Sequence, residues 1–244
     1  AYTLAAAWYL TRGHAALGAV TALAVGLFIL LAHEMGHYFT SRHYGVPASL
    51  PYFIPVPTII GTMGAVIRMR AVIRDRRILF DIGIAGPLAG LAVAVPATLI
   101  GLNLSEVIEA GSTRGGIELG DSLLFMALTR WVCGPLGESQ TVLLQPVAVA
   151  GWLGCCLTSL NLLPMGQLDG GHVTYGILGP RHRIVSRSVF IAILLWGVHG
   201  VFAEINPMGW LWAFAFCWVA VRLAFSTQRT SSNSRSSLLL GVSR

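Results

Sequence analysis

AALGAVTALAVGLFILLA, residues 15–32, is an uncharged run of 18 residues that leads directly into His33-Glu34-Met35-Gly36-His37. A helix needs about 20 apolar residues to cross a bilayer, so this run predicts most of a membrane span. Residues four apart share one face of a helix, so both imidazoles can reach one metal ion. Glu34 faces a neighbouring direction, where its carboxylate can contact a water on that metal. The pattern predicts metal-assisted hydrolysis inside or at the edge of a membrane.

A plainer interpretation of the same residues is a helix with two hydrogen-bonded histidines and a surface glutamate. The residues before His33 are apolar, however, and leave Glu34 no obvious polar surface to face. An ionisable cluster at membrane depth is costly, which favours a functional role.

The composition of the chain agrees with a membrane protein. Its 244 residues are 55% hydrophobic and 11% charged, whereas soluble domains contain about a quarter charged residues. The net charge of +6 could suggest nucleic-acid binding, but the arginines fall where membrane proteins place them, so we expect no nucleic-acid partner. The four cysteines form no Cys-x-x-Cys pair, and neither a disulfide framework nor a cysteine-bound zinc is expected.

Five segments are apolar and long enough, or nearly so, to cross a membrane. Four of them cover about residues 15–43, 79–102, 187–204 and 208–225, and the third in chain order lies within 141–168, a run of 28 residues without a charge. Alternating these spans places 13 of the 16 arginines on one side, which should be the cytoplasmic side, and the His33–His37 motif lies nearer to it.

The predicted fold is an all-α polytopic membrane protein of about five to six transmembrane helices, with a small β-hairpin near the active site. We expect a single membrane core over residues 1–226 and a disordered polar tail over residues 227–244. A short amphipathic helix is predicted at 121–132, inside an acidic loop over residues 103–140.

Residues 45–70 are apolar but rich in proline and glycine, and Ala65-Val-Ile-Arg-Met-Arg alternates with period two, which is typical of a strand or hairpin. Such backbone survives at membrane depth only where protein or water covers it. The alternative is an ordinary interfacial loop. An exposed strand edge here could pair with an unwound substrate peptide.

The stretch NLLPMGQLDGGH, residues 161–172, forms a second cluster of functional residue types. Catalytic zinc takes three protein ligands and leaves one position for water. His33 and His37 supply two, and Asp169 is the best candidate for the third, because Pro164 and the nearby glycines break the helix. The alternative role for Asp169 is a cap in a helix-ending turn.

Taken together, these motifs resemble those of the site-2 proteases, a family of intramembrane zinc metalloproteases. His33-Glu34-x-x-His37 is similar to the zinc-binding helix of the family, and residues 161–172 to its second motif. Residues 61–67, GTMGAVI, resemble the re-entrant hairpin beside the active site, and residues 80–90 resemble the next core helix. No stretch has the length and strand rhythm of a PDZ insert, which places the chain nearer the compact, PDZ-less branch with bacterial and plastid members.

The resemblance implies regulated intramembrane proteolysis with one Zn²⁺ per chain. The implied zinc ligands are His33, His37 and Asp169. Glu34 would act as general base, Asn161 would bind the oxyanion or the substrate backbone, and His172 would either assist or pack. The implied substrate-pairing residues are Gly61, Thr62, Met63 and Gly64. The expected partners are the lipid bilayer and a single-span membrane protein substrate, and the expected location is a bacterial inner membrane.

A membrane zinc transporter is the alternative from another class. Some zinc carriers bind ions in transit on similar histidine-bearing helices, and a broken helix such as residues 161–168 also suits a transporter. A transporter would favour a second cluster of ligands along its path, which this sequence does not display.

Overall fold

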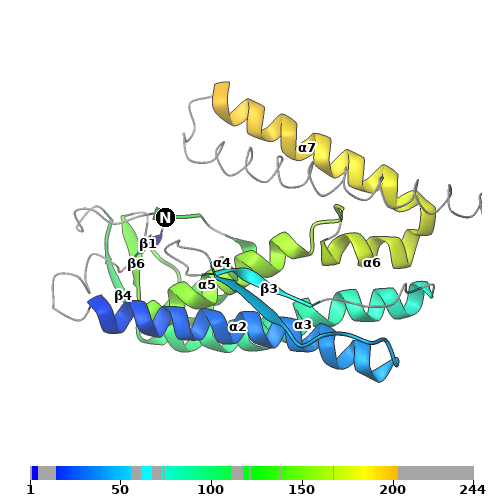
Figure 1. The fold of residues 1–244 in the computed structure, drawn as a ribbon. Helices are drawn as coiled ribbons and strands as arrows, with labels where there is room; N and C mark the ends of the chain where they lie inside the picture. The colour runs from blue at the N-terminus through cyan, green and yellow to red at the C-terminus, as the bar shows by residue number, and fades with distance from the viewer. Residues whose placement is uncertain are drawn as a thin grey trace, which may run out of the picture. The chain divides into compact units, whose positions relative to one another are not determined.

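The computed structural model describes residues 2–4, 15–55, 62–67, 73, 75–110, 118–120, 122–137, 139–166 and 168–202 (Figure 1). Helices dominate these residues, as predicted: α2 (Ala15–His43), α3 (Arg76–Asn103), α4 (Leu123–Cys133), α5 (Pro146–Asn161), α6 (Asp169–Leu178) and α7 (His182–Phe202). By internal contacts the chain divides into two compact units, one of residues 1–74 and 81–161 and one of residues 75–80 and 162–244.

Helix α2 covers the predicted segment 15–43, and Gly45 terminates it two residues after its last residue, His43. The backbone N–H of Gly45 donates to the carbonyl of Arg42 (3.1 Å), and that of Val46 donates to the carbonyl of Ser41 (2.9 Å). Gly45 has φ of 67°, a left-handed conformation that glycine adopts without steric cost. These bonds form a Schellman motif that satisfies the last carbonyls of the helix.

Helix α3 confirms the predicted segment 79–102 and begins three residues earlier. Its start is capped by Asp75, whose carboxylate accepts a hydrogen bond from the backbone N–H of Arg77 (2.8 Å). One face of α3 is built of buried small residues, which include Gly83, Gly86 and Gly90. Small residues let neighbouring helices approach closely.

The predicted third span lies within residues 141–168, but not all of that uncharged run is helix. Strand β6 (Gln140–Leu144) occupies its beginning, and α5 is only 16 residues long. Pro146 lacks an N–H and favours the first position of a helix, so the helix cannot extend back through it. Four of the five residues of β6 are buried, and the strand, like the helix that follows it, contains no charged residue.

Two sheets accompany the helices. Strands β2 (Tyr52–Pro55) and β3 (Thr62–Val66) pair antiparallel, which confirms the strand interpretation of residues 45–70. A four-stranded sheet in the order β4-β6-β1-β5 was not predicted. Its remaining strands are β1 (Tyr2–Leu4), β4 (Glu106–Glu109) and β5 (Glu118–Leu119). The fold is therefore mostly helical rather than all-α.

The four-stranded sheet and α4 share a core with the ends of α3 and α5. Phe125 of α4 and Val142 and Leu144 of β6 are fully buried in it, together with Leu102 and Ala148. The hydroxyl of Ser122 caps α4 by accepting from the N–H of Phe125 (3.2 Å). This helix confirms the prediction at residues 121–132.

Two of the described helices, α2 and α3, are long and apolar enough to cross a membrane. Apolar side chains on α2, including Leu17, Val20 and Phe28, are exposed. Helix α7 covers most of the predicted segment 187–204. The predicted span over residues 208–225 and the polar tail over residues 227–244 lie outside the described residues, so the expected five to six spans and the single core stay predictions.

Candidate metal centre

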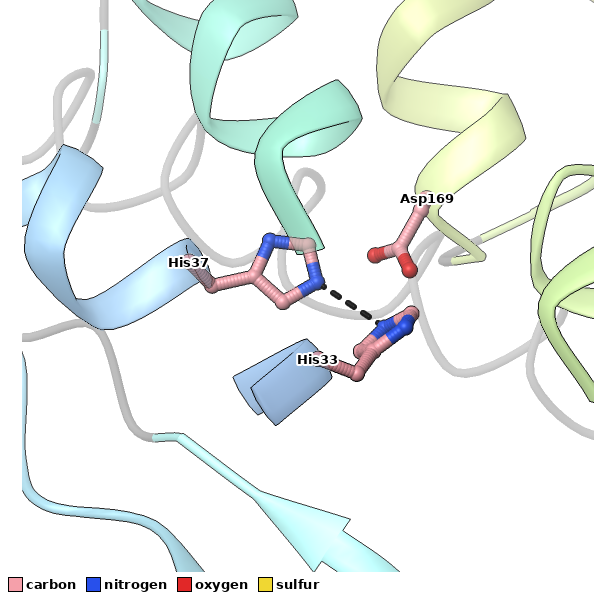
Figure 2. A group of neighbouring side chains, drawn as sticks. All are labelled: His33, His37 and Asp169. Atoms are coloured by element: carbon pink, nitrogen blue, oxygen red, sulfur yellow. Dashed lines mark hydrogen bonds between the residues drawn. The ribbon is translucent and has the colours of Figure 1, made fainter. Parts of the chain in front are cut away.

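The two histidines of α2 lie one helical turn apart, and their rings face the same point (Figure 2). Nε2 of His33 is 3.2 Å from Nε2 of His37. Two nitrogens bound to one tetrahedral zinc at about 2.0–2.1 Å would lie about 3.3 Å apart. The pair therefore already has the spacing that a shared zinc ion requires. His33 is buried, with 5% of its surface exposed, and His37 is half-buried.

The ring of His37 is oriented by the backbone of α3. Its Nδ1 lies 2.7 Å from the carbonyl oxygen of Ile82. A carbonyl can only accept, so Nδ1 carries a proton, and in the neutral ring Nε2 then presents its lone pair. This is the support that metal-binding histidines commonly receive from a backbone carbonyl.

Three glycines make the close approach of α2 and α3 possible. A Cβ at Gly86 would overlap the imidazole of His37. A Cβ at Gly90 would lie 3.2 Å from Cβ and Nδ1 of His33, and one at Gly36 would lie 2.5 Å from the carbonyl oxygen of Ala85. The rings occupy the space that side chains on α3 would otherwise fill. The sequence reasoning missed this role, although the spacing of Gly86 and Gly90 on one helical face was a usable signal.

Asn161, the last residue of α5, lies beside the histidine pair. Its Nδ2 is 3.4 Å from Nε2 of His33. Helix α5 reaches this position by close packing, because a Cβ at Gly154 would lie 2.9 Å from the side chain of Ile29 on α2. The structure thus brings Asn161 to the predicted site, where its amide can donate a hydrogen bond.

Asp169 is the first residue of α6 and is half-buried. The residue at the cap position is Leu168, so Asp169 does not itself occupy the cap. The turn before it is tight: Gly166 has φ of 52°, and a Cβ at Gly170 would overlap the carbonyl of Leu162. A carboxylate in the first turn of a helix interacts favourably with the helix dipole.

His33 and His37 of one unit and Asp169 of the other are side chains that could serve together as metal ligands (Figure 2). Two imidazoles and one carboxylate are a donor set that catalytic zinc sites use, and three protein ligands leave a position open for water. The donor set therefore fits zinc.

The other predicted site residues lie as follows. Glu34 is half-buried on α2, next to His33, and His172 is half-buried on α6. Thr62, Met63 and Gly64 lie in β3, whereas Gly61 is outside the described residues. The roles assigned to these residues stay predictions.

Comparisons with known proteins identify relatives of this chain. The sequence profile of peptidase family M50 matches residues 21–203. The chain is 37% identical over 202 residues to the probable zinc metalloprotease EGY1, chloroplastic, of Arabidopsis thaliana, covering 76% of this chain and 36% of that protein. It is 30% identical over 211 residues to the probable zinc metalloprotease EGY2, chloroplastic, of Oryza sativa subsp. indica, covering 86% of this chain and 35% of that protein. The chain thus spans about a third of the length of these curated relatives.

The solved structure of a site-2 protease from Methanocaldococcus jannaschii aligns with a TM-score of 0.45 and 18% sequence identity, covering 82% of this chain and 76% of that one. The family profile matches well over half of the chain and includes both histidines of α2 and Asp169. The chain belongs to peptidase family M50.

Proposed function

We propose that this chain is an intramembrane zinc metalloprotease that hydrolyses peptide bonds of membrane-embedded proteins. The observation that carries the proposal is the pair of imidazole Nε2 atoms 3.2 Å apart on α2, a helix apolar enough to cross a membrane. A metal site on such a helix places hydrolysis at membrane depth. The zinc metalloprotease names of the relatives agree with this chemistry.

In the proposed mechanism, three side chains would hold a zinc ion: His33, His37 and Asp169. When bound, zinc would supply a Lewis acid that lowers the pKa of a coordinated water toward about 7. Glu34 follows His33 directly, and its carboxylate takes up the proton of the attacking water and returns it to the leaving amide nitrogen. Asn161 donates its Nδ2–H to the oxyanion or to the substrate backbone, a role supported by its 3.4 Å approach to His33.

Substrate peptide bonds in a helix are shielded by their own hydrogen bonds, so a substrate must unwind before cleavage. We propose that the β2–β3 sheet accepts the unwound segment as an added strand through residues 61–64. The proposed substrate is a single-span membrane protein, and the site lies nearer the arginine-rich, cytoplasmic side of the membrane.

The test is Glu34→Gln in the full chain, reconstituted in vesicles with a fluorescent single-span substrate. The variant should retain zinc, measured by mass spectrometry, and lose cleavage, because an amide cannot accept the proton. The matched control is Glu106→Gln, a change at an exposed glutamate of β4, which should cleave at the wild-type rate. Cleavage by Glu34→Gln would remove Glu34 as the base. Zinc flux into the vesicles without any cleavage product would instead support a transporter.

A further inference from the structure

A groove of about 240 Å³ lies between α2 and α5. On α2 it runs from Ala19 to His33, which is about 21 Å at a rise of 1.5 Å per residue. On α5 it runs from Val149 to Asn161. One end of the groove is therefore formed by the same histidine and asparagine that lie together in the candidate metal centre.

Polar groups are concentrated at that end of the groove. The lining from Ala19 to Leu30 is made of alanine, glycine, leucine and isoleucine, and the polar residues in the lining are His33, Thr158 and Asn161. The hydroxyl of Thr158 donates to the carbonyl of Gly154 (2.8 Å), so its proton is used within α5. The carboxamide of Asn161 contacts Nε2 of His33 through Nδ2 at 3.4 Å, and an amide carries a second N–H and an acceptor oxygen that an occupant can use.

The middle of the groove has room beside the backbone of α2. A Cβ built at Gly26 meets no atom within 4 Å, and Ala22 is the neighbouring lining residue one turn earlier. Small residues at such spacing allow another peptide segment to approach a helix closely in a membrane. A side chain introduced at position 26 would therefore start in open space and project into the groove.

We propose that this groove seats an apolar segment of the peptide that is cleaved, with its side chains against Ala22 and Gly26 and its backbone reaching Asn161. The inference rests on the proposed function, whose substrate site it extends. A lipid acyl chain would match the apolar walls, but its one carbonyl is only an acceptor and gives the carboxamide oxygen of Asn161 no donor. A peptide has a carbonyl acceptor and an N–H donor in every residue. Its apolar side chains can therefore pack against the groove walls while its backbone forms hydrogen bonds with Asn161.

Photo-crosslinking tests the occupant directly. A diazirine side chain is introduced at position 26 or, as the control, at position 24, an exposed alanine of α2 outside the groove. Both are made in the full-length Glu34→Gln chain in vesicles that contain a synthetic apolar 20-residue single-span peptide, a length of about one membrane crossing. Position 26 should capture the peptide about tenfold more than position 24. Capture of phospholipid alone, of the chain itself or of a second copy would overturn the proposal.

Filling the groove tests its use in cleavage. Gly26→Leu should raise KM for a single-span substrate about tenfold, whereas Ala24→Leu should leave KM unchanged. Zinc content should be the same in both variants, which shows that the metal centre is intact. Equal kcat/KM in both variants would show that the groove does not bind the substrate, while the protease assignment would stand. If the wild type cleaves nothing yet position 26 still captures the peptide, the protease assignment fails while the groove stands.

Discussion

The imidazole of His37 lies against α3 at two positions, Ile82 and Gly86. The carbonyl oxygen of Ile82 accepts a hydrogen bond from Nδ1 of His37, with 2.7 Å between the two atoms. The absence of a side chain at Gly86 leaves the space that the ring occupies. A ring fixed in one orientation and one tautomer loses little freedom when it binds a metal, so the helix contact contributes to metal affinity.

Gly86→Ala should displace the ring of His37, because the new methyl group would occupy the same space. We expect zinc affinity to fall about 10- to 100-fold, as for other losses of support around a metal ligand. Competition with a fluorescent chelator measures the affinity of the purified chain. Gly120→Ala is the control, since a Cβ there meets no atom within 4 Å. Equal affinity in both variants would show that α2 shifts to accommodate the methyl group.

Asp169→Ala removes the carboxylate from the candidate ligand group. Two imidazoles alone give an incomplete set of protein ligands for catalytic zinc, so the purified variant should carry less zinc than the wild type. Metal analysis after dialysis against a weak chelator is the measurement, and circular dichroism checks that the helix content is retained. Unchanged zinc content would remove Asp169 from the ligand set.

At the scale of elements, one side-chain hydrogen bond connects the residue that follows α2 to α3. The hydroxyl of Tyr44, just past the end of α2, donates to Oδ2 of Asp81 at 2.5 Å. Asp81 immediately precedes Ile82, whose carbonyl orients His37. The Tyr44–Asp81 hydrogen bond therefore links the position of α3 to the metal centre.

Tyr44→Phe should loosen this link without touching the histidines. A hydrogen bond to a charged group contributes about 1.5–3 kcal/mol, but Tyr44 is exposed, so we expect only about a fivefold loss of zinc affinity. The loss of zinc binding caused by Asp169→Ala should be larger than that caused by Tyr44→Phe. Tyr38→Phe, at a half-buried tyrosine of the same helix, is the control. If both phenylalanine variants bind zinc equally well, the Tyr44 hydroxyl does not act on the metal centre.

The sequence predicted α2 and α3 closely because their apolar runs have clear ends, Gly45 at one and Asp75 at the other. At residues 141–168 the sequence located a helix only within a longer uncharged run, because absence of charge does not show where the helix begins. A buried strand and a buried helix have the same apolar composition, and only Pro146 marks the change. The four-stranded sheet escaped prediction because strands of two to five residues are too short to show a period.

Part of the candidate site could likewise be predicted from the sequence, and part could not. His33 and His37 could be paired from sequence because helical spacing alone puts them on one face. The contacts of His37 with Ile82 and of His33 with Asn161 could not, because they join segments 45 and 128 residues apart in the chain. Such contacts depend on how closely helices pack, which the glycine positions permit but do not specify.

At the scale of the whole molecule, α2 distinguishes a membrane protein from a soluble one. Phe28 is 59% exposed near the middle of a 29-residue apolar helix. If lipid covers that face, Phe28→Arg places a charge near the bilayer centre, which costs about 2.5–3.5 kcal/mol on insertion scales. The variant should then insert α2 into microsomal membranes less efficiently than the wild type, as measured by glycosylation of an added acceptor site. The control is Leu50→Arg, at an exposed position beyond the helix, which should insert like the wild type. If Phe28→Arg behaves like this control, the exposed face of α2 contacts water or protein, and proteolysis within the bilayer loses its physical basis.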